Sequence, residues 1–177
     1  MFYSFKKINR VKNSGFSLLE VLIYVASLIF VLAIVTNTFL LMSKSYVGIK
    51  ISQNINNSAI NILERMTREI RWSSGVDSMN SVFNLNSGVL ILNTVDNLGE
   101  IVEKQFYLEN GSVMIKEGTD EPKSLNTGDV QVNKMFLVLG DSGVSTAIKI
   151  ELEIEGSFRD KIKTKTFYDS VVMREGY

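Results

Sequence analysis

A run of 23 residues without charge, glycine or proline, from Val21 to Ser43, constrains this chain more than any other part of its sequence. As a helix rising about 1.5 Å per residue, the run would be about 35 Å long, enough to cross a hydrocarbon core of about 30 Å. Helices of soluble domains rarely stay apolar on all sides over such a length. The sequence therefore predicts a membrane-spanning helix over residues 16–43.

A basic leader and a single acid precede this run. The leader, residues 1–15, carries four basic residues and no acid, and it ends at Gly15. Glu20 follows at the start of the apolar run. Because a carboxylate near the end of a membrane span costs on the order of 1–3 kcal/mol, we expect Glu20 to have a partner or a function.

Cleavage after Gly15 would create such a partner. The new ammonium would lie on Phe16, four residues before Glu20, at a helix N-terminus where a positive charge is poorly placed. Glu20 could neutralise this ammonium or that of a neighbouring copy, and the second pairing would select one axial register between packed helices.

The stretch GFSLLEVLIYV, which begins at Gly15, resembles the cleavage and methylation motif of the type IV pilin superfamily. That superfamily includes pilins, minor pilins and the pseudopilins of type II secretion. The resemblance implies that a prepilin peptidase cuts after Gly15, that Phe16 becomes the methylated N-terminus, and that Glu20 is the carboxylate needed for filament assembly. It also implies other pilins or pseudopilins as helix-packing partners, and membrane lipid before assembly.

Basic residues set the expected orientation of the span. Four precede it, whereas only Lys44 and Lys50 follow within about 20 residues of its end. The leader is therefore expected in the cytoplasm, and the rest of the chain outside the cytoplasmic membrane, later in a periplasmic or surface filament. A secreted signal peptide would place small residues and a cleavage site after the apolar region, and none is obvious here. An ordinary signal anchor stays open as an alternative.

A helical period continues beyond the span. Apolar residues recur every three or four positions: Ile51, Ile55, Ala59, Ile62, Met66 and Ile70. Glu64 with Arg68, and Arg65 with Glu69, form two pairs at four-residue spacing. The sequence predicts one helix over residues 16–74, stopping near Trp72, whose stripe packs on its own domain. A role for the stripe in binding a partner helix stays open.

Residues 75–177 change to short β-branched runs separated by Asn, Gly, Asp and Ser, which predicts a β-rich head. The expected strands are Gly88–Thr94, Glu100–Leu108, Ser112–Glu117, Val130–Leu139, Thr146–Glu155 and Lys161–Val172. The predicted class is therefore α+β, a long helix packed on a C-terminal antiparallel sheet. This order of elements resembles the J-type minor pseudopilins and the related large minor pilins.

Two hairpins are predicted with a definite register. Asn110-Gly111 favours a two-residue turn, because both positions tolerate positive φ, and this pairs Phe106 with Ile115 and Lys104 with Glu117. Near the C-terminus, a five-residue loop over 156–160 would place three glutamates opposite three lysines. The expected pairs are Glu155 with Lys161, Glu153 with Lys163 and Glu151 with Lys165.

The composition argues against enzymatic function. The chain has no histidine and no cysteine, so it lacks the commonest general base, thiol nucleophiles and the usual zinc ligands. We expect no catalytic residue, cofactor or metal, although residues 96–100 and 141–143 contain oxygen ligands that calcium or a simple turn could use. Removing the leader leaves 15 basic and 19 acidic residues, so no broad basic face for nucleic acid is expected.

Two classes of function follow. In the first, the chain is a structural subunit of a pilus-like filament or of a type II secretion pseudopilus, assembled through its N-terminal helix. A tip adhesin or a DNA-uptake minor pilin would share that processing and differ in what the head touches. In the second class, the chain is a single-pass membrane-anchored module that binds a ligand or regulates a partner outside a filament.

Overall fold

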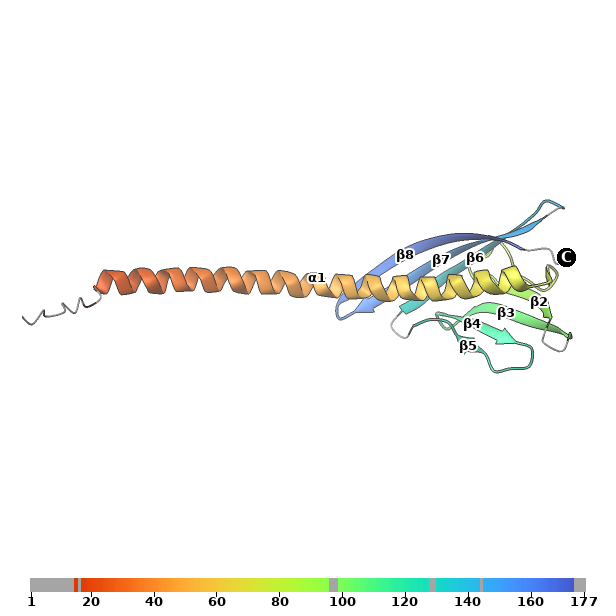
Figure 1. The fold of residues 1–177 in the computed structure, drawn as a ribbon, viewed down its shortest axis with the longest axis horizontal. Coiled ribbons are helices and arrows are strands. Elements are labelled where there is room, and N and C mark those ends of the chain that lie inside the picture. The colour runs from red at the N-terminus through yellow and green to blue at the C-terminus, as the bar shows by residue number, and fades with distance from the viewer. Residues whose placement is uncertain (1–14, 16, 96–98, 128–129, 144, 174–177) are drawn as a thin grey trace, which may run out of the picture. The chain divides into compact units, whose positions relative to one another are not determined.

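The structure is a computed structural model that describes residues 15, 17–95, 99–127, 130–143 and 145–173. The chain divides into two compact units, residues 1–44 and 45–177. Helix α1 (Leu18–Trp72) has 55 residues and belongs to both units, and the described strands all follow it (Figure 1). The α+β class is confirmed, and the helix ends at the predicted residue.

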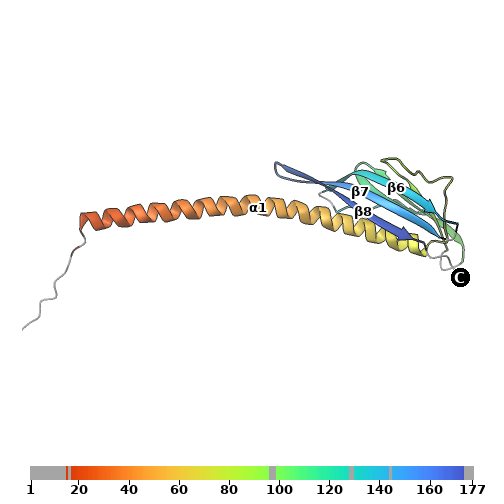
Figure 2. The same ribbon diagram turned by 90° about the horizontal axis from the view of Figure 1, so that it is seen from above.

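The second half of α1 carries the predicted apolar stripe. From Val47 to Ile70, seven apolar residues of the helix are buried, at most 6% exposed, and they include all six predicted positions. The stripe packs against apolar side chains of both sheets and forms one core with them. The two sheets lie on the same side of this half of the helix, as the turned view in Figure 2 shows. The stripe therefore packs on its own domain, as predicted.

The strands form two antiparallel sheets, where the sequence predicted one. The first sheet consists of β1 (Gly75–Val76), β2 (Leu90–Val95), β3 (Ile101–Glu109), β4 (Ser112–Glu117) and β5 (Lys123–Ser124). The second consists of β6 (Val130–Asp141), β7 (Thr146–Phe158) and β8 (Lys161–Val172). All six predicted strands are present, whereas the two-residue strands β1 and β5 were not predicted.

Backbone hydrogen bonds tie the first sheet and its loops to β6. The Gly88 N–H donates to the Met135 carbonyl at 2.8 Å, and the Val132 N–H donates to the Gly111 carbonyl at 2.8 Å. The segment before β2 thus covers the edge of β6, which would otherwise present unpaired backbone groups. These bonds make the two sheets parts of one head.

The β3–β4 hairpin has the predicted register. Asn110 and Gly111 both have positive φ, at 49° and 75°, as a two-residue turn of this kind requires. Phe106 pairs with Ile115, and Lys104 pairs with Glu117. The turn residues and the cross-strand pairs both favour this one register, and the prediction is confirmed.

The predicted register of the β7–β8 hairpin is wrong by three residues. β7 continues to Phe158, the turn contains only Arg159 and Asp160, and Arg159 has a φ of 54°. Glu155 therefore pairs with Thr164 instead of Lys161. Because the shift is odd, it moves the lysines of β8 to the opposite face from the glutamates of β7.

Gly156, predicted to lie in a loop, lies inside β7 beneath α1. A Cβ added there would lie 2.8 Å from Ile55 Cγ1 and 3.1 Å from Ile51 Cγ2. We expect Gly156→Ala to lower the free energy of unfolding by about 1–3 kcal/mol, because the helix would have to move outward. Gly140→Ala is the matched control, since its Cβ would meet only the Ala147 carbonyl at 3.8 Å. The free energy of unfolding of both variants can be measured by denaturant unfolding in detergent, and equal values would contradict this packing.

Candidate functional site

Ser17 caps the N-terminus of α1. Its side-chain oxygen accepts a hydrogen bond from the Glu20 N–H at 3.2 Å, and its carbonyl accepts from the same N–H at 3.0 Å. A serine followed three residues later by a glutamate is the sequence pattern of a capping box. The capping role of Ser17 was not predicted, although the pattern is present in the sequence.

Glu20 lies in the first turn of α1, half-buried, with its carboxylate held by the next turn. The Tyr24 hydroxyl donates a hydrogen bond to Glu20 Oε1 at 3.1 Å. A carboxylate is also favoured at this end of a helix by the unpaired N–H groups and the helix dipole. Tyr24 was not predicted as part of the site, although its four-residue spacing from Glu20 would have placed it on the same face.

Gly15 precedes the helix and is exposed. A Cβ added there would meet no atom within 4 Å. The described contacts therefore give no steric reason for a glycine at this position. Phe16 and the leader residues 1–14 lie outside the described residues, and so does the predicted contact between the Phe16 ammonium and Glu20.

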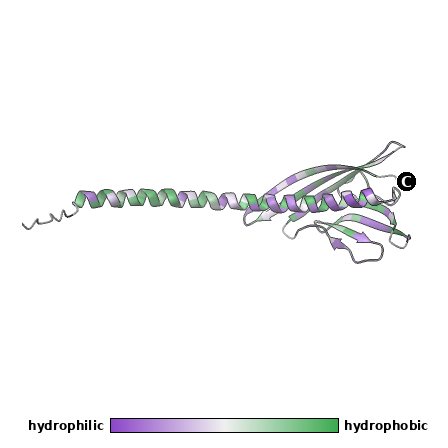
Figure 3. Cartoon of the chain, viewed as in Figure 1, coloured by the Kyte–Doolittle hydropathy of each residue, from purple (hydrophilic) through white to green (hydrophobic). Residues whose placement is uncertain are grey.

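The first half of α1 presents an apolar surface on all sides. Every large apolar side chain from Leu18 to Met42 is exposed, and none of the most apolar stretch of the helix is buried. Figure 3 shows that this half of the helix is mostly hydrophobic. The hydroxyl groups of Ser27, Thr36 and Thr38 donate to carbonyls of their own helix. The helix is long and apolar enough to cross a membrane.

Comparison with known proteins adds no assignment. The chain was compared with family models, curated proteins and solved structures, and none of them matches it. The functional reading therefore rests on the residues and geometry of the chain itself.

In the head, four charged side chains join α1 to the β3–β4 hairpin. Glu69 Oε1 lies 3.0 Å from Arg65 Nε, and Glu69 Oε2 lies 2.7 Å from Lys104 Nζ. Arg65 Nη2 reaches Glu117 Oε1 at 2.7 Å, which completes the charged cluster. The predicted pair Arg65–Glu69 is confirmed, whereas Arg68 lies 3.7 Å from Glu69 and was predicted to pair with Glu64.

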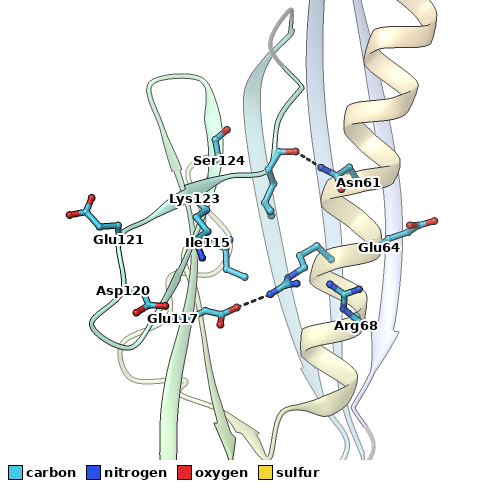
Figure 4. A pocket seen from close by; sticks show the side chains of 11 residues that line it. Asn61, Glu64, Arg68, Ile115, Glu117, Asp120, Glu121, Lys123 and Ser124 are labelled. Atoms are coloured by element: carbon cyan, nitrogen blue, oxygen red, sulfur yellow. Dashed lines mark hydrogen bonds and ion pairs between the residues drawn. The ribbon is translucent and has the colours of Figure 1, made fainter. Parts of the chain in front are cut away.

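A groove of about 470 Å³ lies beside this cluster, between α1 and the turn after β4 (Figure 4). Its rim carries Arg68 and Lys123 together with Glu64, Asp120 and Glu121. This mixture of signs selects neither an anionic nor a cationic ligand. We therefore assign no binding site to the groove.

The two segments with oxygen ligands that calcium could use gain no support as metal sites. In the second, Asp141 Oδ1 accepts a hydrogen bond from the Gly143 N–H at 2.8 Å, as a simple turn requires. In the first, residues 96–98 lie outside the described part of the chain. Within the described residues, no group of three potential metal ligands from Asp and Glu was found.

Proposed function

We propose that this chain is a structural subunit of a pilus-like filament or of a type II secretion pseudopilus. A prepilin peptidase would hydrolyse the Gly15–Phe16 peptide bond, leaving a carboxylate on Gly15 and an ammonium on Phe16. The Phe16 amine would then be methylated. The chain would wait in the cytoplasmic membrane with its head outside, and then join a filament through α1.

One observation carries this proposal: an uncovered apolar helix begins with a capped and hydrogen-bonded carboxylate. The large apolar side chains from Leu18 to Met42 are exposed in the described part of the chain, and Glu20 lies at the start of this surface. A lipid-anchored helix needs the apolar surface but not the acid, which is costly in a membrane. A helix that packs against copies or homologues can use both.

Assembly would exchange one apolar environment for another. Within lipid, the exposed side chains of α1 contact hydrocarbon tails, and within a filament they would contact neighbouring helices. Because tails are as apolar as leucine, this exchange gives little driving force, and specific packing decides which helices associate. The pairing of Glu20 with a neighbour's Phe16 ammonium would then set the axial position of each subunit.

The mass of the mature N-terminus tests this proposal directly. We expect the membrane-extracted protein to begin at N-methyl-Phe16, and Gly15→Ala to accumulate as the uncut precursor, because a peptidase of this class reads the glycine. Gly15→Ala is a clean variant, since an added Cβ meets no atom within 4 Å. A functional protein that retains its leader would favour the single-pass anchored module instead.

A further inference from the structure

The tip of the β7–β8 hairpin is strongly basic on one face. Between Ser157 and Lys165 the chain carries four basic residues and a single acid, Asp160. The observed register places Lys163 opposite Gly156 and Lys165 opposite Ile154, whereas Glu155 lies opposite Thr164. The glutamates of β7 therefore do not face these lysines across the strands.

This basic face lies along the first residues of α1 in the head unit. Lys163 Nζ donates to the Gly48 carbonyl at 3.2 Å and to Ser52 Oγ at 3.3 Å. Lys165 Nζ donates to Asn56 Oδ1 at 3.2 Å. These partners are neutral, so the hydrogen bonds fix the positions of the lysines without cancelling their charge.

The helix beside the hairpin adds no negative charge. From Ser45 to Leu63, α1 carries Lys50 and no acid. Apolar side chains of the same region are exposed as well: Tyr46 on α1 is 62% exposed, and Ile162, on the other face of β8 from the lysines, is 66% exposed. A hairpin tip with basic residues on one face and an exposed aliphatic group on the other, beside a tyrosine of the helix, matches the region of a bilayer where headgroups meet hydrocarbon.

Along the chain, this surface follows the apolar run directly. Gly48 comes five residues after Ser43, the last residue of the run, which is about 8 Å of helical rise. The headgroup region on each side of a bilayer is about 5–8 Å thick. Lys163, which contacts α1 at Gly48, would therefore lie within reach of lipid phosphates when the run spans a bilayer. Lys165 contacts α1 at Asn56, about 20 Å along the helix from Ser43, and so lies beyond the headgroups.

We propose that the tip of the β7–β8 hairpin, with Arg159, Lys161 and Lys163, binds the headgroups of anionic phospholipids at the extracytoplasmic membrane surface. The contact would hold the head against the membrane before any filament forms, and it would be released when the subunit leaves the lipid. This proposal depends on α1 spanning a bilayer and does not require processing at Gly15 or pairing of Glu20.

The test uses the full-length chain in nanodiscs. The chain has no cysteine, so Ser157→Cys carries a single fluorophore at the exposed hairpin tip. Two nanodisc preparations contain the same mixture of phosphatidylcholine and phosphatidylglycerol. In one the headgroup quencher is attached to phosphatidylcholine, and in the other to phosphatidylglycerol. We expect the phosphatidylglycerol quencher to act more strongly than its phosphatidylcholine counterpart, and added salt to weaken this preference. Ser170→Cys, near the other end of β8, should show no preference.

A variant that lacks two of the charges tests whether they attract anionic lipid or whether the hairpin tip merely lies near the membrane. Arg159→Asn with Lys161→Gln should lower the lipid preference about fivefold for each charge removed. Asparagine suits the positive φ of Arg159, so the turn should be retained, and circular dichroism would verify the fold. Lys149→Gln, an exposed lysine on β7 outside the hairpin tip, should leave the preference unchanged.

Three results would overturn the proposal. Equal quenching by the two lipids would show no selection for anionic headgroups. Loss of the preference when inorganic phosphate is added at constant ionic strength would indicate a site for free anions. An unchanged preference in the folded double variant would show that these charges do not bind lipid, and would leave an acidic protein surface as their partner.

Discussion

Glu20→Gln is expected to be processed normally and yet to enter filaments about a hundredfold less than the parent chain. In the proposed filament, Glu20 would pair with a neighbour's Phe16 ammonium, and removing one partner of a buried ion pair costs about 3–5 kcal/mol because the other charge is left unpaired in an apolar environment. A factor of about a hundred or more in assembly follows from that cost. The measurement compares sheared filaments with the membrane pool by immunoblot, and mass spectrometry checks the N-terminus.

Glutamine is a sharper substitution than alanine at this position. Ser17 Oγ accepts a hydrogen bond from the backbone N–H of residue 20, which any side chain at this position leaves in place, and glutamine also keeps the sequence pattern of a capping box. Its side-chain oxygen can still accept the hydrogen bond from Tyr24. The variant thus removes the charge while it keeps the start of the helix intact.

Tyr24→Phe is the matched control for this experiment. It removes the hydroxyl that donates to Glu20 at 3.1 Å but keeps the ring and the carboxylate. A hydrogen bond to a charged group contributes about 1.5–3 kcal/mol when nothing replaces it. Because another donor can take the place of the lost hydroxyl at the Glu20 carboxylate, we expect the incorporation of Tyr24→Phe into filaments to stay within a few fold of the parent. Equal loss in both variants would mean that the Glu20–Tyr24 pair, and not the charge, is what assembly requires.

The features that the sequence predicted well are those set by local or periodic signals. The stripe from Ile51 to Ile70 repeats with the period of a helix, and Asn110-Gly111 specifies a turn almost by itself. Each of these signals acts over a few residues and has few competing solutions. The helix bounds and the β3–β4 register followed directly.

The β7–β8 register failed because the wrong interaction was given priority. Matching Glu155 with Lys161 required a five-residue loop, but exposed ion pairs are worth about 0–1 kcal/mol. Extending β7 through Gly156 pairs more backbone groups and lets α1 approach a residue without a side chain. Burial and backbone pairing outweigh surface charge, and that contact with α1 lies far away in the sequence.

The candidate site was predictable only in part for a similar reason. Gly15 and Glu20 are visible because a glycine and an acid are unusual beside an apolar run. Ser17 and Tyr24 are ordinary residue types whose role depends on where the helix begins. In the head, the sequence predicted Arg65–Glu69 and Lys104–Glu117 separately. That they form one cluster depends on how the β3–β4 hairpin packs on α1.

This cluster makes Glu69 the most vulnerable charged residue of the head. Its side chain is only 5% exposed, and it lies between Arg65 on its own helix and Lys104 on β3. The Lys104 side chain is itself only 19% exposed. If the Glu69 carboxylate is removed, Lys104 keeps only a contact of 3.6 Å with Glu117 Oε1, an oxygen that Arg65 already binds at 2.7 Å.

We expect Glu69→Ala to lower the free energy of unfolding of the head by about 1–3 kcal/mol, because Lys104 loses its partner at 2.7 Å and must share Glu117 with Arg65. Glu64→Ala, an exposed acid on the same helix, should change it by less than about 0.5 kcal/mol. Thermal and denaturant unfolding in detergent, followed by tryptophan fluorescence and circular dichroism, would measure both.

The double variant Glu69→Ala with Lys104→Ala separates loss of an attraction from the cost of an orphaned charge. If the cost comes mainly from the weakly paired Lys104 ammonium, removing that lysine as well should restore part of the lost stability, so the two effects will not add. The remaining cavity and the lost contact between Arg65 and Glu69 would keep the double variant below the parent. Additive losses would instead mean that Glu69 and Lys104, although 2.7 Å apart, stabilise the head independently, and the cluster would not be the link between α1 and the β3–β4 hairpin.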